Sequence, residues 1–228
     1  LDNILLHIAT AITIFLLMNF IFKNNTFAFF TALLFAIHPI QWEAVANISG
    51  RAILLSAFFY INAFFSFCRA VDKHKNKDYW CALVCFGLAL LSKESAIVLP
   101  LLLFSYLWFS RRAFYPTFSH MLKVVLPFLM LEASYLLIRQ AFGISNFFYW
   151  RSVSESFLGF MTFLRSVLTA IRLLVWPIDL HFDRMRPVFV NFAEIQLLGT
   201  VLIFILGFAV LSKLRKQYPS IVLFFMTW

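Results

Sequence analysis

Long apolar runs separated by short polar joints dominate this sequence of 228 residues. The runs are roughly 12–20 residues long, which suits helices that cross a hydrocarbon layer of ~30 Å. They lack the period-two alternation of transmembrane strands. The chain is 63% hydrophobic and 13% charged, whereas soluble domains are about half apolar and about a quarter charged. The sequence therefore predicts an all-α, polytopic transmembrane protein.

About eight spans are expected, and we treat 1–228 as one transmembrane domain. We place the spans at 4–22, 26–37, 52–67, 79–91, 96–109, 124–138, 197–211 and 220–228. Both ends look cut, because the chain begins at Leu1 rather than Met and because the last run has too few residues to cross alone. We therefore expect the domain to be incomplete at both ends.

Basic residues gather in alternate joints and predict the orientation of the spans. They are Lys23, Arg69, Lys73, Lys75, Lys77, Arg111, Arg112, Lys123, Lys213, Arg215 and Lys216. All of them fall on one side if the spans alternate and 157–176 does not cross, and an excess of Lys and Arg marks the cytoplasmic side. The opposite side then receives the loops 38–51, 92–95 and 143–194. We expect the chemistry to occur there, facing away from the cytoplasm.

The segment 157–176 carries Arg165 and Arg172, seven residues apart and so on one face of a helix. An arginine at the centre of a spanning helix costs ~2.5–3.5 kcal/mol on insertion scales. We therefore interpret this segment as an interfacial or re-entrant helix. The alternative is a true span whose arginines face a cavity.

The joint HPIQWEAVANISGR, residues 38–51, places many polar groups between two apolar runs. Pro39 should end the preceding helix, since the residue before a proline resists the α-helical region. The spacing between 40 and 48 is helical, so Glu43 and Asn47 would share one face, with His38 and Arg51 at the two ends. This is the pattern of a short surface helix whose polar groups point into a cleft. The alternative is an ordinary solvated loop.

Two further joints carry charge at the expected membrane boundary. In SKES, 92–95, Lys93 precedes Glu94, and the lysine either extends to lipid headgroups or holds a phosphate. In PIDLHFDRMRP, 177–187, Arg184 follows Asp183, and a guanidinium suits a phosphate because it donates two hydrogen bonds at once. The alternative for these cations is a basic face in contact with bulk anionic lipid.

Several other classes of function are disfavoured. No pair of ligands has metal-type spacing such as HxxxH, so we expect no divalent metal. Nucleic-acid binding is not supported, because the positive charge belongs to the orientation signal. A transporter would place ionisable groups at mid-membrane, whereas the charges here lie at the ends of spans, apart from Glu132 and Arg139.

The order of these motifs resembles the transmembrane-and-TPR O-mannosyltransferases and their bacterial relatives, in the GT-C superfamily of polyprenyl-phosphate-sugar-dependent glycosyltransferases. The resemblance covers roughly residues 1–195. It rests on HPIQWEAVANISGR, where His38, Pro39, Ile40, Glu43, Ala44, Val45, Ala46, Ile48, Gly50 and Arg51 match, then on Lys93 and Glu94, then on Pro177, Leu180, Phe182 and Asp183. The first motif is long and fairly specific, while the other two gain weight from their order.

The resemblance implies a GT-C-like membrane enzyme that moves a sugar, commonly mannose, from a polyprenyl-phosphate carrier to a hydroxyl of a protein acceptor on the periplasmic or lumenal face. No cofactor is implied. The expected partners are membrane lipids, the lipid-linked sugar, the acceptor and possible subunits of a larger membrane complex. The short joints favour a bacterial inner membrane over the endoplasmic reticulum.

Site residues follow from the same resemblance. The substrate is expected at His38, Glu43, Asn47, Arg51, Glu94 and Asp183, and the lipid phosphate at Lys93, Arg172 and Arg184. The acidic general base should lie in an external loop before Leu1, and we do not assign it to Asp2. The alternative function is a non-catalytic membrane scaffold subunit that retains the fold and lacks the catalytic loop.

Overall fold

A computed structural model describes residues 1–110, 118–143, 153–178 and 180, and within them every regular element is a helix. The all-α prediction is confirmed. The α-helices are α1 (Asp2–Phe22), α2 (Asn25–Ile37), α3 (Trp42–Ala46), α4 (Arg51–Lys73), α5 (Asn76–Ser92), α6 (Leu99–Ser110), α7 (Phe118–Ala141) and α8 (Val153–Val175); the 3₁₀-helices are η1 (Pro39–Gln41), η2 (Ile48–Gly50) and η3 (Glu94–Val98).

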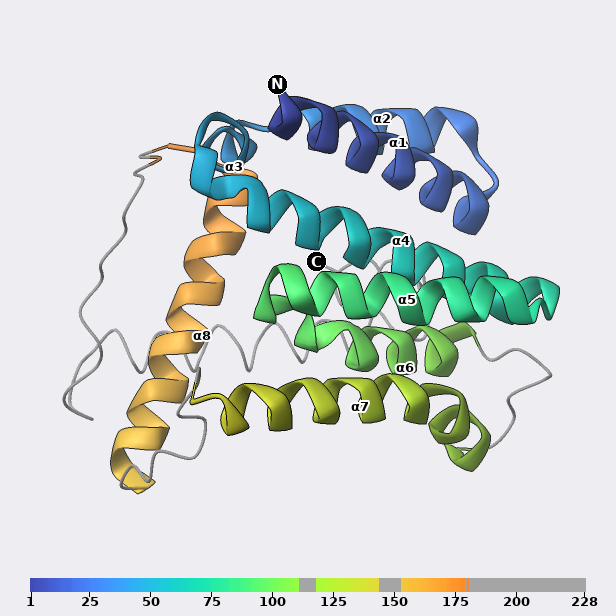
Figure 1. Ribbon diagram of the computed structural model, residues 1–228. Coiled ribbons are helices and arrows are strands. Elements are labelled where there is room, and N and C mark those ends of the chain that lie inside the picture. The colour runs from blue at the N-terminus through green and yellow to red at the C-terminus, as the bar shows by residue number, and fades with distance from the viewer. Residues whose placement is uncertain (111–117, 144–152, 179, 181–228) are drawn as a thin grey trace. The chain divides into compact units, whose positions relative to one another are not determined.

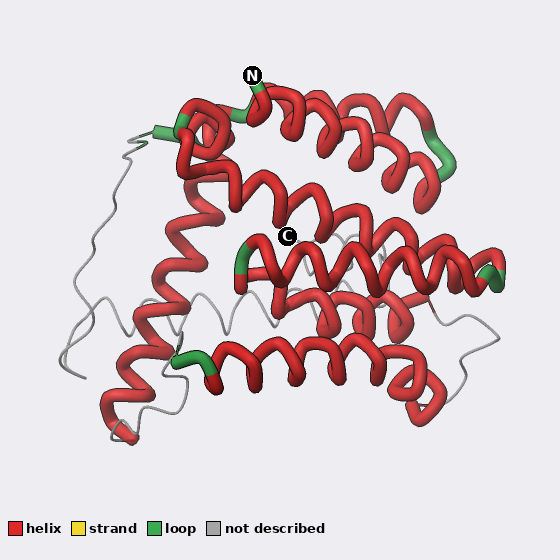
Figure 2. The backbone as a smooth tube through the Cα atoms, in the orientation of Figure 1, coloured by secondary structure: helices red, strands yellow, loops and turns green. Residues whose placement is uncertain are grey.

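The chain divides into two compact units, Leu1–Ile144 and Ser145–Trp228. In the first unit α1 packs beside α2 and α4, α4 beside α5, and α7 against α5 and α6. Figures 1 and 2 show these helices running roughly side by side with short joints at their ends. The core lies between α4, α5 and α7, where the fully buried rings of Phe67, Phe86 and Phe128 meet.

Outward-facing apolar side chains fit a lipid environment. On α1, a stripe at helical spacing exposes between 45% and 57% of each side chain, and it consists of Leu5, Ile8, Ile12 and Leu16. A helix that is apolar all round is either buried or a membrane span. The exposed stripe on α1 therefore supports the prediction that this is a multi-pass membrane protein.

The expected number of about eight spans is wrong. Within the described chain, four helices are long and apolar enough to cross a membrane, or five if Asn25–Ile37 and Pro39–Ala46, bent by 47°, form one span. The helices expected at 79–91 and 96–109 do form, but α5 has 17 residues and α6 has 12. At 1.5 Å per residue they are about 26 Å and about 18 Å long, short of the ~30 Å layer. The segments 197–211 and 220–228 lie outside the described residues.

The polar joints and the basic joints lie at opposite ends of the helices in the first unit. One end holds the joint with α3, together with the start of α4 and the end of α5 (Figure 1). The other end holds the α1–α2 joint and the α4–α5 joint. The first end carries the polar segments 38–51 and 92–95, and the second carries Lys23 and Lys73. This arrangement agrees with the orientation that the basic joints predict.

In the second unit the structure describes α8 in detail. Phe157–Val175 is among the four helices long and apolar enough to cross a membrane. The segment that we assign to the interface therefore also fits the alternative, a true span, and it runs without a break. Leu158 and Met161 are buried and pack with Leu164.

Candidate functional site

The segment 38–51 is held by its own polar side chains. His38 ends α2 in an extended conformation, and its Nδ1 accepts a hydrogen bond of 3.2 Å from the Ile40 backbone N–H, which caps η1. Pro39 follows in the first turn of η1, so the predicted end of the preceding helix is confirmed. Three short helices replace the single surface helix expected between 40 and 48.

The break falls at Asn47, which ends α3 in an extended conformation. Its Oδ1 accepts hydrogen bonds from the backbone N–H of Ser49 (3.1 Å) and from the Ser49 hydroxyl (3.2 Å), and it caps η2. Glu43 is exposed on α3 and has no hydrogen bond or ion pair to any described residue. The prediction that Glu43 and Asn47 lie one turn apart on one continuous helix is therefore wrong, because the chain leaves the helix after Ala46.

Gly50 explains how α3 packs back onto the start of α4. Its backbone is so close to Ala44 that a Cβ at Gly50 would overlap the Ala44 carbonyl group. A glycine is used where the backbone must approach another chain segment this closely. The glycine of HPIQWEAVANISGR is therefore required by the shape of the segment.

Side chains at the start of α1 contact the segment 38–51. The side-chain amide of Asn3, buried at 9% exposure, donates to the carbonyl oxygens of Asn47 (2.8 Å) and Val45 (3.3 Å). Arg51 Nη2 lies 3.2 Å from Asp2 Oδ2 in an ion pair whose side chains are both more than half exposed. The amide contacts fix the backbone of the segment, while the exposed ion pair adds little stability.

A second buried polar group joins α1 to the end of α2. His7 Nε2 lies 3.0 Å from the Ala36 carbonyl oxygen, and its ring stacks on Phe35 with 5.1 Å between centroids. Sequence reasoning did not single out Asn3 or His7. The partners of Asn3 lie 42 and 44 residues away, and the partner of His7 lies 29 residues away. The signal was a polar residue at the start of, or within, an apolar run, a position that lipid would disfavour.

The turn after α5 carries Lys93 and Glu94. The Lys93 backbone is extended, and its N–H donates to the Ala89 carbonyl oxygen (2.9 Å), to which the buried Ser56 hydroxyl also donates (3.3 Å). The Lys93 side chain is half-buried and makes no hydrogen bond to a described residue. The turn is thus fixed through its backbone, and the lysine ammonium is available to a ligand.

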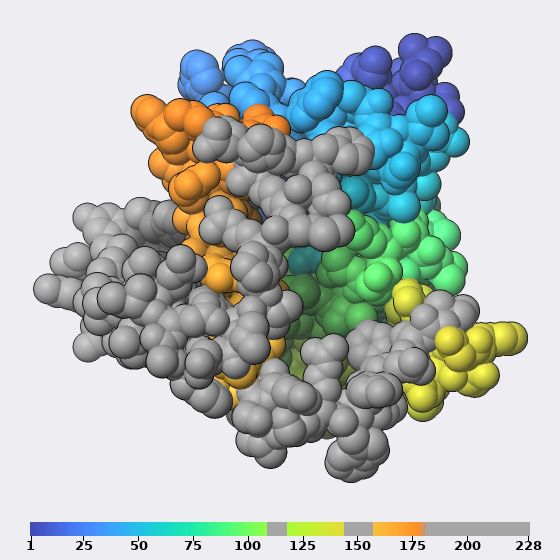
Figure 3. All heavy atoms as spheres, turned by 90° about the vertical axis from the view of Figure 1, so that its left-hand side faces the viewer, coloured from blue at the N-terminus to red at the C-terminus, as the bar shows by residue number. Residues whose placement is uncertain are grey.

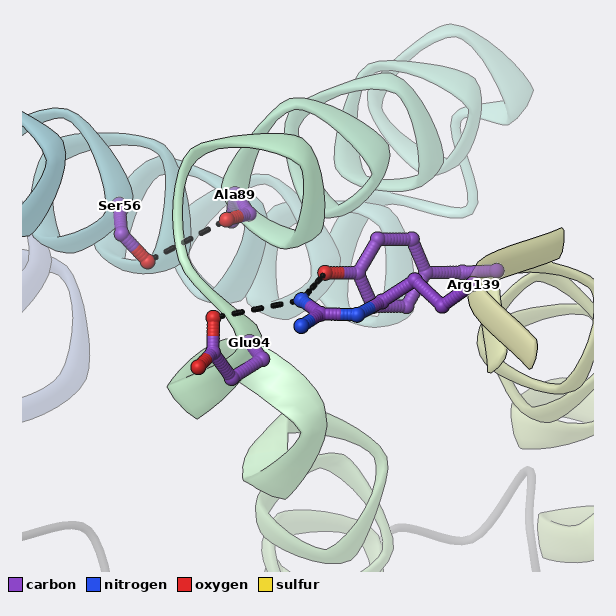
Figure 4. A network of polar contacts seen from close by, with 5 residues as sticks. Ser56, Ala89, Glu94 and Arg139 are labelled. Carbon is purple, nitrogen blue, oxygen red and sulfur yellow. Dashed lines mark hydrogen bonds and ion pairs between the residues drawn. The ribbon is translucent and has the colours of Figure 1, made fainter. Parts of the chain in front are cut away.

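Glu94 is linked to the end of α7. Arg139 Nη1 lies 3.4 Å from Glu94 Oε2 and donates to the Tyr135 hydroxyl at 2.8 Å, as Figure 4 shows for the arginine and the carboxylate. Glu94 lies in the joint between α5 and α6, and its pKa is lowered. The main cause is the hydrogen bond that its own backbone N–H donates to the carboxylate, and the nearby charges of Arg139 and Lys93 add to it. Desolvation of the carboxylate acts in the opposite direction. The carboxylate is thus held in its charged form beside two cations.

These residues come from joints at one end of the first unit, and Figure 3 looks onto that side. The structure brings six of them to this end, namely His38, Glu43, Asn47, Arg51, Lys93 and Glu94. It also brings Arg139 there, which sequence reasoning excepted from the charges at the ends of spans. Arg172 is exposed in the last turn of α8, in the second unit. Asp183 and Arg184 lie outside the described residues.

A metal ion has no evident site in the described part of the chain. No three His, Cys, Asp or Glu side chains there gather closely enough to bind one. The polar end instead presents amides, an exposed carboxylate and basic groups. Such a set can form hydrogen bonds with hydroxyl groups and attract a phosphate.

Known proteins are similar to part of the chain. The family described as dolichyl-phosphate-mannose-protein mannosyltransferase matches residues 1–145. The human protein O-mannosyl-transferase TMTC1 is 46% identical over 72 residues, which are 31% of this chain and 8% of that protein. The human protein O-mannosyl-transferase TMTC3 is 38% identical over 99 residues, which are 42% of this chain and 11% of that protein.

An insect relative gives the same result. The Drosophila melanogaster protein O-mannosyl-transferase Tmtc3 is 40% identical over 82 residues, 33% of this chain and 9% of that protein. The chain thus matches about a tenth of the length of these relatives, and no solved structure matches it. Because the family match covers more than half of the chain, including both polar joints of the first unit, the chain belongs to the dolichyl-phosphate-mannose-protein mannosyltransferase family.

Proposed function

We propose that this chain forms part of the membrane domain of an enzyme that transfers mannose from a polyprenyl-phosphate carrier to a hydroxyl of a protein acceptor. One observation carries the proposal. The family match spans the unit in which the polar segments 38–51 and 92–95 gather at the same end of the helices, opposite the basic joints. The proposal places this end on the periplasmic or lumenal face.

Lys93 is assigned to the lipid phosphate. A phosphate that leaves with the polyprenol carries growing negative charge during transfer, and a nearby cation stabilises that charge. The Lys93 ammonium lies at the end of α5 and is not used in a hydrogen bond within the described chain. Arg172 and Arg184 are proposed to add to this role.

Glu43 and His38 are assigned to the sugar or the acceptor. Glu43 is exposed and not used in a hydrogen bond within the described residues, so its carboxylate can accept hydrogen bonds from hydroxyl groups. Arg51, Glu94 and Asp183 are proposed to line the same site. Asn47 is also proposed to line this site, and its Oδ1 caps η2. No general base is assigned to these residues.

The test measures transfer of radiolabelled mannose from polyprenyl phosphate to an acceptor peptide by the full-length protein in membranes. Lys93→Gln should lower kcat/KM about tenfold to a hundredfold, the loss expected for a hydrogen bond to a charged group. Glu43→Gln should lower kcat/KM with the acceptor. Lys77→Gln, which removes one charge from the opposite end, is the matched control and should leave activity unchanged.

Two results would count against the proposal. If Lys93→Gln and Glu43→Gln both retain full activity while inserting normally, the assignment of the site is wrong. If the wild-type protein inserts and folds but transfers no mannose from any polyprenyl-phosphate donor, the scaffold alternative replaces the enzyme.

A further inference from the structure

A pocket of about 350 Å³ opens at the basic end of the first unit, opposite the proposed transferase site. It lies where α4 ends, α5 begins and the second turn of α7 passes. Ala70, Val71 and Val124 contribute its apolar lining. The mannosyl-transfer proposal gives this pocket no role.

Cationic side chains reach the pocket from two directions. Lys75 comes from the joint between α4 and α5, next to His74, and Lys123 comes from α7. No carboxylate lines the pocket in the described chain, and neither lysine is paired with an acid there. The nearby Asp78 is held by Arg69 at 3.2 Å. The two ammonium groups therefore leave a local excess of positive charge.

The pocket is held in a fixed shape by the aromatic core beneath it. The Tyr79 hydroxyl donates to the Val124 carbonyl oxygen at 2.8 Å, which joins α5 to α7 along one wall. The Tyr79 and Phe128 rings lie nearly perpendicular with 5.6 Å between their centroids, and Phe128 in turn contacts Phe67 and Phe86. Lys75 and Lys123 are thus presented by elements that are packed together. Such preorganisation lowers the cost of ordering a binding site.

We propose that this pocket binds a phosphate monoester or diester, as carried by the headgroup of an anionic membrane lipid. Lysine ammonium groups bind phosphate as point charges, and the Asn76 amide at the rim can donate further hydrogen bonds. The volume exceeds that of a single phosphate and falls in the range of small-molecule sites. The ends of spanning helices lie at the depth of lipid headgroups. The proposal does not depend on the transfer reaction.

Isothermal titration calorimetry of the protein in neutral detergent tests this site with three probes: short-chain phosphatidylglycerol, short-chain phosphatidylcholine and inorganic phosphate. The wild type should bind phosphatidylglycerol and not phosphatidylcholine. The double variant Lys75→Gln/Lys123→Gln should raise the Kd for phosphatidylglycerol at least about tenfold, since two hydrogen bonds to a charged group are lost.

The matched control, Lys23→Gln/Lys77→Gln, removes two lysines from the same end but outside the pocket and should keep the Kd within about twofold of the wild type. Lys75→Gln alone, at an exposed position, keeps the test valid if the double variant misfolds. Competition by inorganic phosphate supports a site for small phosphates, and its failure to compete supports a lipid headgroup. The proposal is overturned if both double variants weaken binding equally, or if the wild type binds neither phosphatidylglycerol nor phosphate.

Discussion

Arg139 Nη1 lies 3.4 Å from Glu94 Oε2 and joins the end of α7 to the turn between α5 and α6. The same nitrogen donates to the Tyr135 hydroxyl one turn earlier, and the guanidinium lies over the Tyr135 ring at 5.6 Å. The ring and the hydroxyl thus orient the arginine toward Glu94. This contact connects two elements of the proposed transferase site that are far apart in the sequence.

Removing this ion pair should weaken the protein slightly. Glu94 is 57% exposed, so Arg139→Gln and Glu94→Gln should each cause only a small loss in the free energy of unfolding. Chemical denaturation in detergent measures the change. Because the two side chains interact directly, the double variant should lose less than the sum of the single losses. Strict additivity would show that the contact carries no energy.

The ion pair also predicts a dependence on pH. The pKa of Glu94 is lowered in the folded protein, so its contribution to stability is present above its unfolded pKa and is lost as the pH falls through the folded pKa. The difference in stability between the wild type and Glu94→Gln should therefore shrink on acidification. Thermal unfolding at a series of pH values measures it. A difference that grows toward acid would contradict the lowered pKa.

Gly50 should not tolerate a side chain. Gly50→Ala places a methyl group against the Ala44 carbonyl, and such overpacking costs about 1–3 kcal/mol. Gly87→Ala is the matched control, because its Cβ would lie 3.7 Å from Leu131 Cδ2, an ordinary contact, and alanine favours a helix by about 0.5–1 kcal/mol. Thermal midpoints should fall for Gly50→Ala and hold or rise for Gly87→Ala. The reverse order would refute the close approach.

The Asn3 amide should stabilise the segment 38–51. Asn3→Asp keeps the shape but replaces the donor with a carboxylate that faces two carbonyl oxygens, and leaving buried groups unpaired costs about 1–3 kcal/mol. Asn25→Asp, at an exposed position in the first turn of α2, should be neutral or slightly stabilising because a helix start favours negative charge. Urea unfolding compares the two. Equal midpoints would show that the Asn3 contacts are weak.

Asn47 offers a way to separate structure from binding. Asn47→Ala removes the cap on η2 and should lower the free energy of unfolding by about 1 kcal/mol. Asn47→Asp retains an oxygen acceptor and should restore stability. If Asn47→Asp also restores transferase activity, the residue acts through the cap. Normal stability with low activity would instead assign the amide to the substrate.

The sequence predicted features that depend on neighbouring residues. The end of α2 followed from Pro39, and the grouping of polar and basic joints at opposite ends followed from the charges along the chain. The number of spans was harder to predict, because α5 and α6 are apolar yet shorter than the hydrocarbon layer. An apolar composition alone does not show that a helix crosses the membrane.

Tertiary contacts account for the remaining differences. The helical spacing of Glu43 and Asn47 is real in the sequence, but the backbone is extended at Asn47, and Gly50 packs back against Ala44. Arg139 lies in an apolar run, and its partner Glu94 lies 45 residues away. A pattern within one segment carries no information about such a partner.

The amide contact between Asn3 and Asn47 bridges 44 residues, and this fixes an order of events during biosynthesis. Synthesis proceeds from the N-terminus, so the residues of α1 are joined to the chain before Asn47 is added. The amide contacts of the polar segment need none of the helices made later. A nascent chain that ends shortly after α4 therefore contains every group needed to set the backbone of HPIQWEAVANISGR.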